Sequence, residues 1–216
     1  MVEHSESAKD YYNLGNSHLK LGELEHAISA YQQAIQIDPN LAIVHNNLGR
    51  AYRQKGQLEQ AIAAYQQAIQ IDPNYAHAHN NLGLVYHKQG QLEQAIAAYQ
   101  QAIQIDPNLA DSYFSLGLAY RQKGQLEQAI AALQKAIQID PNHSVAHNRL
   151  GLAYEEQGKT EQAIAAFQQA LQIDPNYSKA HNSLADIQQG RKMTKVGCFA
   201  GILVLILILL YIFIFR

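Results

Sequence analysis

A single block of sequence, Gln57–Asn74, is repeated along this chain at a fixed interval. It recurs letter for letter at Gln91–Asn108, and again at Gln125–Asn142 with only Leu133 and Lys135 changed. Looser copies bring the number of Asp-Pro-Asn triplets to five, each 34 residues from the next. A fixed period of roughly 20–50 residues is typical of stacked repeats, in which one unit cannot bury its apolar face alone. The chain is therefore predicted to be a solenoid.

The spacing of the apolar residues predicts two helices in each repeat. Along the block they lie three or four residues apart, with Glu and Gln on the other side, as in an amphipathic helix. Pro73 ends this helix because it lacks an N–H group, and Asn74 is predicted to cap the next one. That next helix runs from Ala76 to about Gln89 and stops at Gly90. In each repeat, helix A is the helix that ends at the glycine, and helix B is the helix that ends at the proline. The predicted fold class is all-α.

Glycine also occurs inside helix A, always at the same phase of the repeat. Glycine in a helix costs about 0.5–1 kcal/mol relative to alanine, so its recurrence predicts that another helix comes very close at this point. The expected neighbours are the small alanines at one phase of helix B. The glycines are Gly15, Gly49, Gly83, Gly117 and Gly151, and the alanines are Ala27, Ala61, Ala95, Ala129 and Ala163.

A helix–turn–helix unit of this length, with Leu-Gly, Tyr, Ala, an aromatic residue, Ala and Pro in order, resembles the tetratricopeptide repeat (TPR). In the second repeat the matching residues are Leu48, Gly49, Tyr52, Ala61, Tyr65, Ala68 and Pro73. At positions 45, 79 and 147 this chain has histidine where the family often has a large aromatic residue. In the fourth repeat, Leu133 stands where the other repeats have the second aromatic residue of the pattern. The resemblance covers residues 8–177 as five repeats (8–41, 42–75, 76–109, 110–143, 144–177), and residues 178–190 copy helix A as a capping helix. It implies a right-handed superhelix whose concave groove is lined by helix A and binds peptides.

The ends of the chain differ from the repeats. Residues 1–7 are polar and predicted to be disordered, although Ser7 and Asp10 resemble a capping box that opens the first helix. Val196–Phe215 contains 20 residues without a charge, which as a helix would span about 30 Å, the thickness of the hydrocarbon layer of a bilayer. The alternative, a buried core helix, would need apolar partners on all sides. We therefore predict one transmembrane helix that follows a basic linker, residues 191–195.

The charges around this apolar segment predict its orientation. Arg191, Lys192 and Lys195 precede it and Arg216 alone follows it, so the repeats are expected in the cytoplasm and the C-terminus across the membrane. This layout resembles a tail-anchored protein. Gly197 and Gly201 form a GxxxG pair, which offers a homodimer contact between two membrane helices.

Composition and motifs exclude several classes of function. Residues 1–190 hold 12 of the 16 Lys and Arg and all 18 acids, and this acidic balance argues against a nucleic acid partner. No phosphate-binding loop, nucleophile elbow or cysteine-based metal spacing is present, so we predict no enzyme activity, no cofactor and no metal. The histidines are expected to be structural. A single cysteine excludes an internal disulfide.

Three features of helix A are candidates for peptide binding, because helix B is almost constant between copies and helix A is not. Carboxamides before the Leu-Gly pair could bond a peptide backbone as a ladder, leucines one turn later with a nearby phenylalanine could form an apolar strip, and cations could attract acidic groups. The alternatives are solvated polar positions, leucines buried between helices, and a solvated charged face. The candidate residues are Asn13, Asn16, Asn47, Asn81, Arg50, Arg53, Leu84, Phe114, Leu118, Arg121, Arg149 and Leu152.

One specialisation of the family is not predicted. TPR co-chaperones hold the acidic C-terminus of heat-shock chaperones with Lys, Asn, Asn, Lys and Arg at fixed places. Here those places hold Tyr12, Asn16, Asn47, His77 and Asn81, so every cation of that clamp is missing.

The predicted function is a membrane-anchored scaffold or assembly factor that binds a segment of a partner protein in the concave groove. One alternative is a stable accessory subunit of a membrane complex, held mainly through its transmembrane helix. Two others are an enzyme or its regulatory arm, for which no catalytic residues are visible, and a solenoid that associates with itself.

Overall fold

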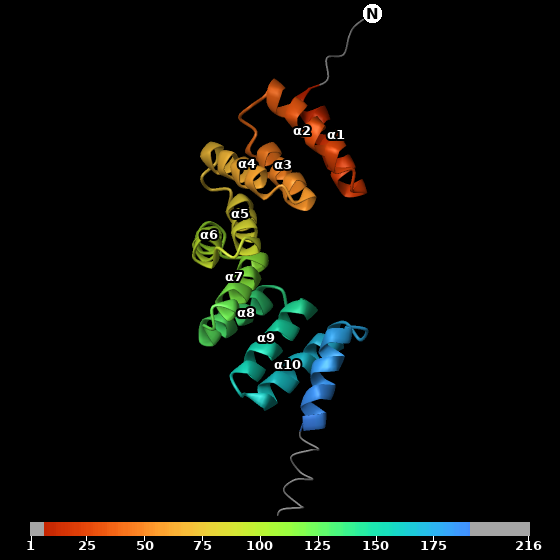
Figure 1. Cartoon of the computed structure of the whole chain (residues 1–216), viewed down its shortest axis with the longest axis vertical. Coiled ribbons are helices and arrows are strands. Elements are labelled where there is room, and N and C mark those ends of the chain that lie inside the picture. The colour runs from red at the N-terminus through yellow and green to blue at the C-terminus, as the bar shows by residue number, and fades with distance from the viewer. Residues whose placement is uncertain (1–6, 191–216) are drawn as a thin grey trace, which may run out of the picture. The chain divides into compact units, whose positions relative to one another are not determined.

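A computed structural model describes residues 7–190 of the chain. The all-α prediction is confirmed, because no strand occurs in this range (Figure 1). Residues 178–190 are also helical. The other helices are α1 (Ala8–Leu21), α2 (Leu24–Ile37), α3 (Ala42–Lys55), α4 (Leu58–Ile71), α5 (Ala76–Lys88), α6 (Leu92–Ile105), α7 (Ala110–Gln122), α8 (Leu126–Ile139), α9 (Ser144–Glu156) and α10 (Thr160–Ile173).

The chain divides into two compact units. Unit 1 is Met1–Pro141 and contains α1 to α8, which are the first four helix A–helix B pairs. Unit 2 is Asn142–Arg216 and contains α9, α10 and the helical residues 178–190. In unit 2, α9 packs against α10 as helix A packs against helix B in the other repeats.

Within unit 1, each helix packs against the next one along the chain. The A helices α1, α3, α5 and α7 also contact one another in succession, whereas no direct packing between B helices occurs among the described residues. A stack in which only the A helices touch must curve toward them. Helix A therefore lies on the inner side of unit 1, where the TPR resemblance placed the groove.

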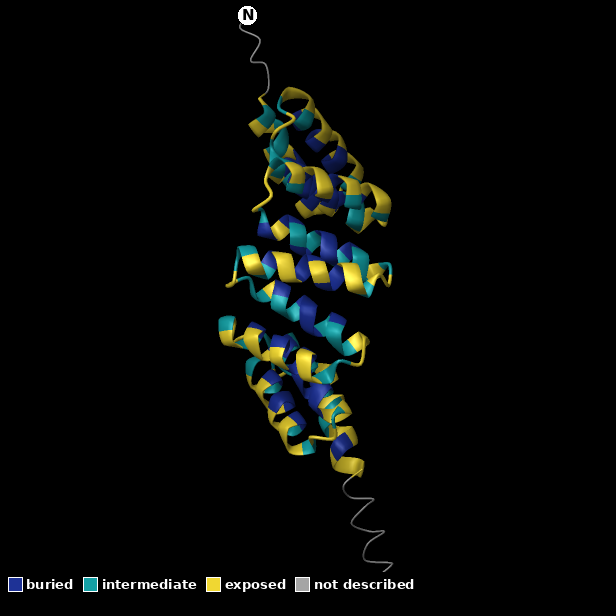
Figure 2. Ribbon diagram, turned by 90° about the vertical axis from the view of Figure 1, so that its left-hand side faces the viewer, coloured by how far each residue is buried: buried dark blue, intermediate teal, exposed yellow. Residues whose placement is uncertain are grey.

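Large apolar side chains of helix B fill the interior. Tyr31, Tyr65 and Tyr99 are completely buried in unit 1, as are Leu133 and, in unit 2, Phe167. Tyr65 shares a cluster with Leu82 and Val85 of the following repeat, so each repeat completes the core of its neighbour. Figure 2 shows buried positions recurring along every helix.

The glycines inside helix A are explained by these side chains. A Cβ atom on Gly49 would lie 2.7 Å from the Tyr65 ring, and one on Gly117 would lie 2.7 Å from Leu133. The predicted close approach is confirmed, and its expected partners are right in part. The nearest atoms belong to the large residue four positions after the alanine, but the carbonyl oxygens of Ala95 and Ala129 also lie 3.2 Å from a Cβ added at Gly83 and Gly117.

The Asp-Pro-Asn triplets form turns in a way that differs from the prediction for Asn74. The Asp72 Oδ1 atom accepts a hydrogen bond from the backbone N–H of Asn74 at 3.0 Å, and the triplets at Asp38, Asp106 and Asp174 do the same at 2.9–3.0 Å. The N-cap of α5 is Tyr75, which makes no side-chain cap. The capping role expected of Asn74 was therefore wrong, because the aspartate side chain organises the turn through the backbone two residues on.

Polar contacts between neighbouring repeats recur with the 34-residue period, and each contact joins two residues that are 30 positions apart. Lys55 Nζ lies 2.5 Å from Glu25, Gln89 Nε2 donates to Glu59 at 3.3 Å, and Lys123 Nζ lies 3.0 Å from Glu93. Each contact joins the end of helix A to the start of the preceding helix B. The glutamate side chains of the two ion pairs are 71% and 78% exposed, so these contacts contribute little to stability.

The predictions for the two ends of the chain compare differently with the structure. The capping box is confirmed: Ser7 Oγ accepts from the Asp10 N–H, and Asp10 Oδ2 accepts from the Ser7 N–H. None of the helices between residues 7 and 190 combines the length and the apolar character that crossing a bilayer requires. The predicted basic linker, transmembrane helix and Gly197–Gly201 pair lie outside the described residues.

Candidate functional site

A polar hollow of about 390 Å³ lies between α1 and α3 on the inner side of unit 1. We call it the α1–α3 hollow. It brings together three of the residues predicted from sequence, Asn16, Asn47 and Arg50. The other residues that line it, Tyr12, Leu19 and Lys20, come from α1 and were not predicted.

Side-chain amides form a continuous hydrogen-bonded chain beside this hollow. The Tyr31 hydroxyl donates to Asn16 Oδ1 at 2.7 Å, and Asn47 Nδ2 donates to the same oxygen at 2.9 Å. Asn46 Nδ2 donates to Asn47 Oδ1 at 3.3 Å, and Asn81 Nδ2 donates to Asn46 Oδ1 at 2.9 Å. This amide chain links α1, α3 and α5, and it holds the walls of the hollow in a fixed arrangement.

The amide chain uses some of the hydrogen-bonding groups that the predicted asparagine ladder would offer to a peptide. Asn47 is only 9% exposed, and its Nδ2 atom is already used within the protein. Asn81 is half-buried and also donates internally, whereas Asn13 is exposed. The three asparagines are therefore not equivalent rungs. Asn46, which sequence analysis overlooked, is 4% exposed and connects two of them.

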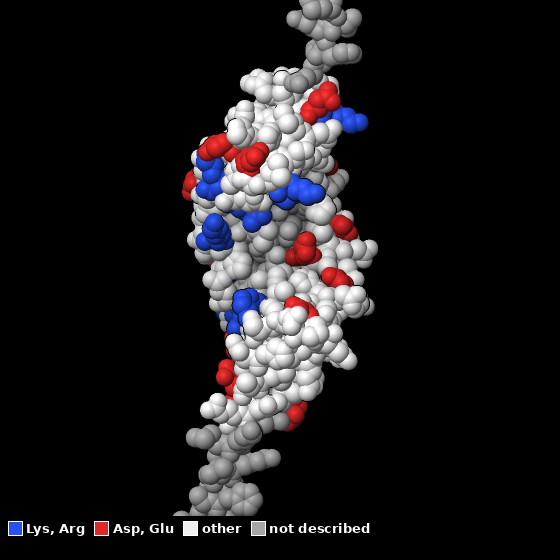
Figure 3. All heavy atoms as spheres, turned by 90° about the vertical axis from the view of Figure 1, so that its right-hand side faces the viewer, with Lys and Arg blue, Asp and Glu red and all other residues white. Residues whose placement is uncertain are grey.

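Cations lie beside the buried tyrosines of helix B. Burial raises the pKa of Tyr31 to about 12, and Arg50 opposes that rise. Burial also raises the pKa of Tyr65, and the nearby half-buried Arg53 opposes it. On the face drawn in Figure 3, Lys and Arg side chains lie in several separate places, with Asp and Glu side chains among them. Two cations, Lys20 and Arg50, line the α1–α3 hollow, and of these only Arg50 belongs to the predicted basic residues.

The predicted apolar strip is partly built into the core. Leu84 packs against the buried cluster that contains Ile96, Tyr99 and Leu116. Phe114, Leu118 and Arg121 on α7 are half-buried, as are Arg149 and Leu152 on α9 in unit 2. These side chains offer a ligand only part of their surface.

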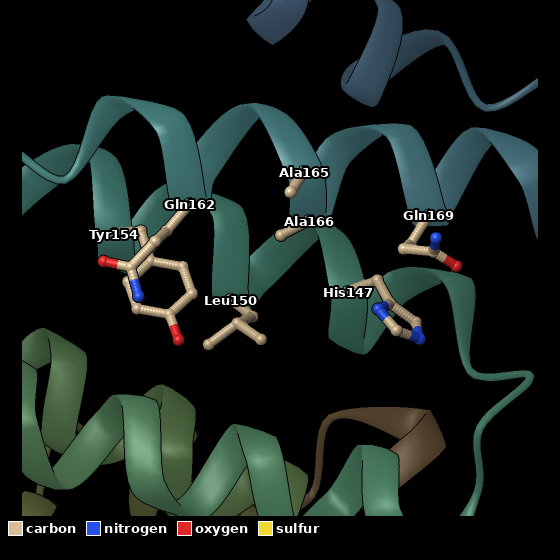
Figure 4. A pocket seen from close by; sticks show the side chains of 7 residues that line it. All are labelled: His147, Leu150, Tyr154, Gln162, Ala165, Ala166 and Gln169. Atoms are coloured by element: carbon tan, nitrogen blue, oxygen red, sulfur yellow. The ribbon is translucent and has the colours of Figure 1, made fainter.

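Unit 2 contains a second hollow, of about 280 Å³, which sequence analysis did not predict. Figure 4 shows Gln162 next to the Tyr154 ring at one end and Gln169 near His147 at the other, with Leu150, Ala165 and Ala166 between them. The leucines equivalent to Leu150 in the second, third and fourth repeats, Leu48, Leu82 and Leu116, are buried, whereas Leu14 of the first repeat is exposed. None of the residues that line this second hollow is among the predicted ligand contacts.

Histidines near the start of helix A have a structural role that sequence analysis described incompletely. His45 Nε2 lies 3.0 Å from the carbonyl oxygen of Pro39, and His79 and His181 make the same contact with Pro73 and Pro175 at 3.0 and 2.8 Å. Each histidine ties its helix to the Asp-Pro-Asn turn six residues earlier. The proline and the histidine are six residues apart in each of these three cases, and this constant spacing could have predicted the contact from sequence.

Comparisons with known proteins agree with this architecture. Residues 2–185 match the family described as "Cilia and flagella-associated protein 70 C-terminal domain", a TPR domain. No curated protein sequence matched.

Solved structures with the same repeat architecture include a crystal structure of MamA, which is 32% identical, with a TM-score of 0.68 over 77% of this chain and 97% of that chain. YrrB, described as a TPR protein with an unusual peptide-binding site, is 25% identical, with a TM-score of 0.65 over 84% and 93% of the two chains. Pseudomonas aeruginosa pilF, at 22% identity, a TM-score of 0.77 and 86% coverage of both chains, shares the fold. By its repeats, its helix packing and these matches, the chain belongs to the TPR family that includes the C-terminal domain of cilia and flagella-associated protein 70.

Proposed function

We propose that this protein is a membrane-anchored scaffold or assembly factor that holds a segment of a partner protein along helix A of unit 1. The observation that carries the proposal is the α1–α3 hollow, which combines carboxamides and cations on the inner side of the stack. YrrB, a relative by structure, is described as having a peptide-binding site, and this supports a peptide as the kind of ligand.

The chemistry of the hollow favours a carboxylate on the partner segment. Lys20 and Arg50 contribute positive charge, Asn16 and Asn47 contribute amides, and no Asp or Glu is found among the described residues that line it. Arginine can bond a carboxylate with two parallel N–H groups. Lys20 and Arg50 thus place two cations one helical turn after Asn16 and Asn47.

A charge-removal experiment tests this assignment. Crosslinking in the native membrane first identifies the partner, and the affinity of the purified partner is then measured for Arg50→Gln and Lys20→Gln. Each variant should bind at least tenfold more weakly, since a hydrogen bond to a charged group contributes about 1.5–3 kcal/mol. The matched control is Lys135→Gln, which removes an exposed cation from helix B of the fourth repeat. Equal affinity of the three variants for the partner would contradict the proposal that the α1–α3 hollow binds it.

The membrane part of the proposal rests on the sequence of Val196–Phe215 and on the basic residues before it. In this proposal the repeats face the cytoplasm, the C-terminus lies across the membrane, and anchoring raises the effective concentration of the groove near membrane partners. Protease added to intact cells should spare the repeats. Deletion of residues 191–216 should release a folded protein from the membrane fraction.

The same experiments separate the proposal from a permanent accessory subunit. A subunit held through its membrane helix would remain in a complex of fixed stoichiometry after mild detergent, even with Arg50→Gln. A scaffold that binds through the groove would lose its partner in that variant. If Gly197 and Gly201 mediate a homodimer, replacing both with Ile should abolish crosslinked dimers without changing partner binding.

A further inference from the structure

The first repeat differs from all later repeats at three positions that lie close together. His18 stands where the other repeats have tyrosine, and His26 stands where they have glutamine. Glu23 stands where three of them have glutamine and the fifth has Lys159. All three differences replace a residue that rarely binds metals with one that commonly does. The equivalent residues are Tyr52, Tyr86, Tyr120 and Tyr154, then Gln57, Gln91 and Gln125, and finally Gln60, Gln94, Gln128 and Gln162.

The turn between α1 and α2 brings these side chains together. Gly22 adopts a left-handed conformation with φ of 77°, which reverses the chain after α1, and the Glu23 N–H donates to the His18 carbonyl at 2.9 Å. The His18 Nδ1 atom lies 2.5 Å from Glu23 Oε2, and the ring centroids of His18 and His26 are 5.2 Å apart. One potential ligand atom from each residue lies within 4.8 Å of the other two.

We propose that His18, Glu23 and His26 bind a divalent transition metal ion, with Zn²⁺ as the best match. Two imidazole nitrogens and one carboxylate oxygen form a ligand set that suits Zn²⁺, whereas Ca²⁺ and Mg²⁺ prefer oxygen ligands. Bonds of about 2.0–2.2 Å to a tetrahedral ion require ligand atoms roughly 3.3 Å apart. Small rotations of these partly or fully exposed side chains would separate His18 and Glu23 from 2.5 Å and bring ligand atoms that lie up to 4.8 Å apart closer together. A water molecule or an outside ligand completes the fourth position.

Neighbouring charges are consistent with this ligand set. Glu25, the other acid near the start of α2, pairs with Lys55 of the next repeat at 2.5 Å and is not one of the three ligands. The site connects the last turn of α1 to the first turn of α2. Within the described residues, the first repeat packs against only one other repeat, so a metal ion at this turn would stabilise the repeat with the fewest neighbours.

Calorimetric titration of ZnCl₂ into the untagged, metal-free full chain in mild detergent tests the proposal. The variants are His18→Tyr, Glu23→Gln and His26→Gln, each of which introduces the residue that later repeats carry at that position. The control is His77→Gln, which removes an exposed histidine elsewhere in unit 1. We expect one Zn²⁺ per chain, at least tenfold weaker binding in each of the three variants, and unchanged affinity in the control.

A second measurement separates binding from folding. Zn²⁺ should raise the thermal midpoint of the wild-type chain and of His77→Gln, and it should leave the midpoint of His26→Gln unchanged. Unfolding without metal should be similar for wild type and His26→Gln, because glutamine occupies this position in the four other repeats. It should also be similar for His77→Gln, which changes an exposed side chain. Absence of saturable Zn²⁺ binding, or equal affinity in wild type and His26→Gln, would overturn the proposal.

Discussion

Asn47 donates a hydrogen bond from Nδ2 to Asn16 Oδ1 at 2.9 Å, which joins α3 to α1 across 31 positions of the chain. The same oxygen accepts from the Tyr31 hydroxyl of α2. This arrangement makes Asn16 the acceptor through which three helices are held together. It also means that residues proposed to contact a ligand stabilise the surface on which that ligand would bind.

The first prediction concerns this stabilising role. Asn47→Ala should lower the free energy of unfolding by about 1–2 kcal/mol, because a buried hydrogen bond is lost and Asn46 loses a partner. Asn13→Ala, at the equivalent but exposed position of α1, should change it by less than about 0.5 kcal/mol. Urea unfolding followed by circular dichroism measures both. Equal midpoints for the two variants would show that the amide chain does not stabilise the fold.

The second prediction concerns the glycine in helix A. Gly49→Ala should destabilise the protein by about 1–3 kcal/mol, because the added Cβ would lie 2.7 Å from a carbon of the Tyr65 ring. A double-mutant cycle tests this, with thermal unfolding of wild type, Gly49→Ala, Tyr65→Ala and the variant that carries both changes. Gly49→Ala should be much less harmful in a Tyr65→Ala background, and strict additivity would contradict the packing explanation.

The third prediction concerns the histidine that contacts the Asp-Pro-Asn turn. His79→Phe keeps an aromatic ring but removes the bond to the Pro73 carbonyl, so stability should fall by about 0.5–1.5 kcal/mol. His77→Phe is the control, since His77 is exposed on the same helix. Hydrogen exchange of the backbone amides at the start of α5 should increase only in His79→Phe. Identical exchange in the two variants would show that the contact does not hold the turn.

The fourth prediction concerns alkaline pH. The pKa of Tyr31 is raised to about 12 from an ordinary value of 10.0 because burial disfavours the charged phenolate. A group with a raised pKa in the folded state contributes stability below its unfolded pKa and loses that contribution as pH rises through its folded pKa. Stability should therefore fall between pH 10 and about 12.

Replacement of Tyr31 by Phe should reduce this dependence without removing it. The pKa values of Tyr65 and Tyr99 are raised by burial as well, and these groups would still titrate in the same direction. Urea midpoints measured from pH 9 to 11.5 give the slope for each protein. A slope that is the same in wild type and Tyr31→Phe would contradict the assignment.

The repeat period and the helix pattern could be predicted from sequence because they depend on local spacing. The apolar period, Pro73 and Gly90 were sufficient to place α4 and α5. The amide chain could not be predicted, because a hydrogen bond between Asn46 and Asn81 depends on the rotation of one repeat relative to the next. The turn chemistry was misassigned for a local reason: both Asp72 and Asn74 can cap, and only the geometry decides between them.

The candidate site was predicted less completely than the fold. Sequence comparison between repeats selected Asn16, Asn47 and Arg50, since these positions vary where helix B does not. It overlooked Lys20, because the charge lies one helical turn from Asn16 and its contribution depends on the space between α1 and α3. It also treated Leu84 as a ligand contact, although much of this side chain packs in the core.

Site-specific photocrosslinking in the native membrane tests the central claim most directly. A photoreactive residue at Arg50 in the α1–α3 hollow should form an adduct with the partner protein, whereas one at the exposed Gln67 on helix B of the same repeat should not. Adducts from Gln67 with none from Arg50 would contradict the proposal that the partner lies along the A helices of unit 1.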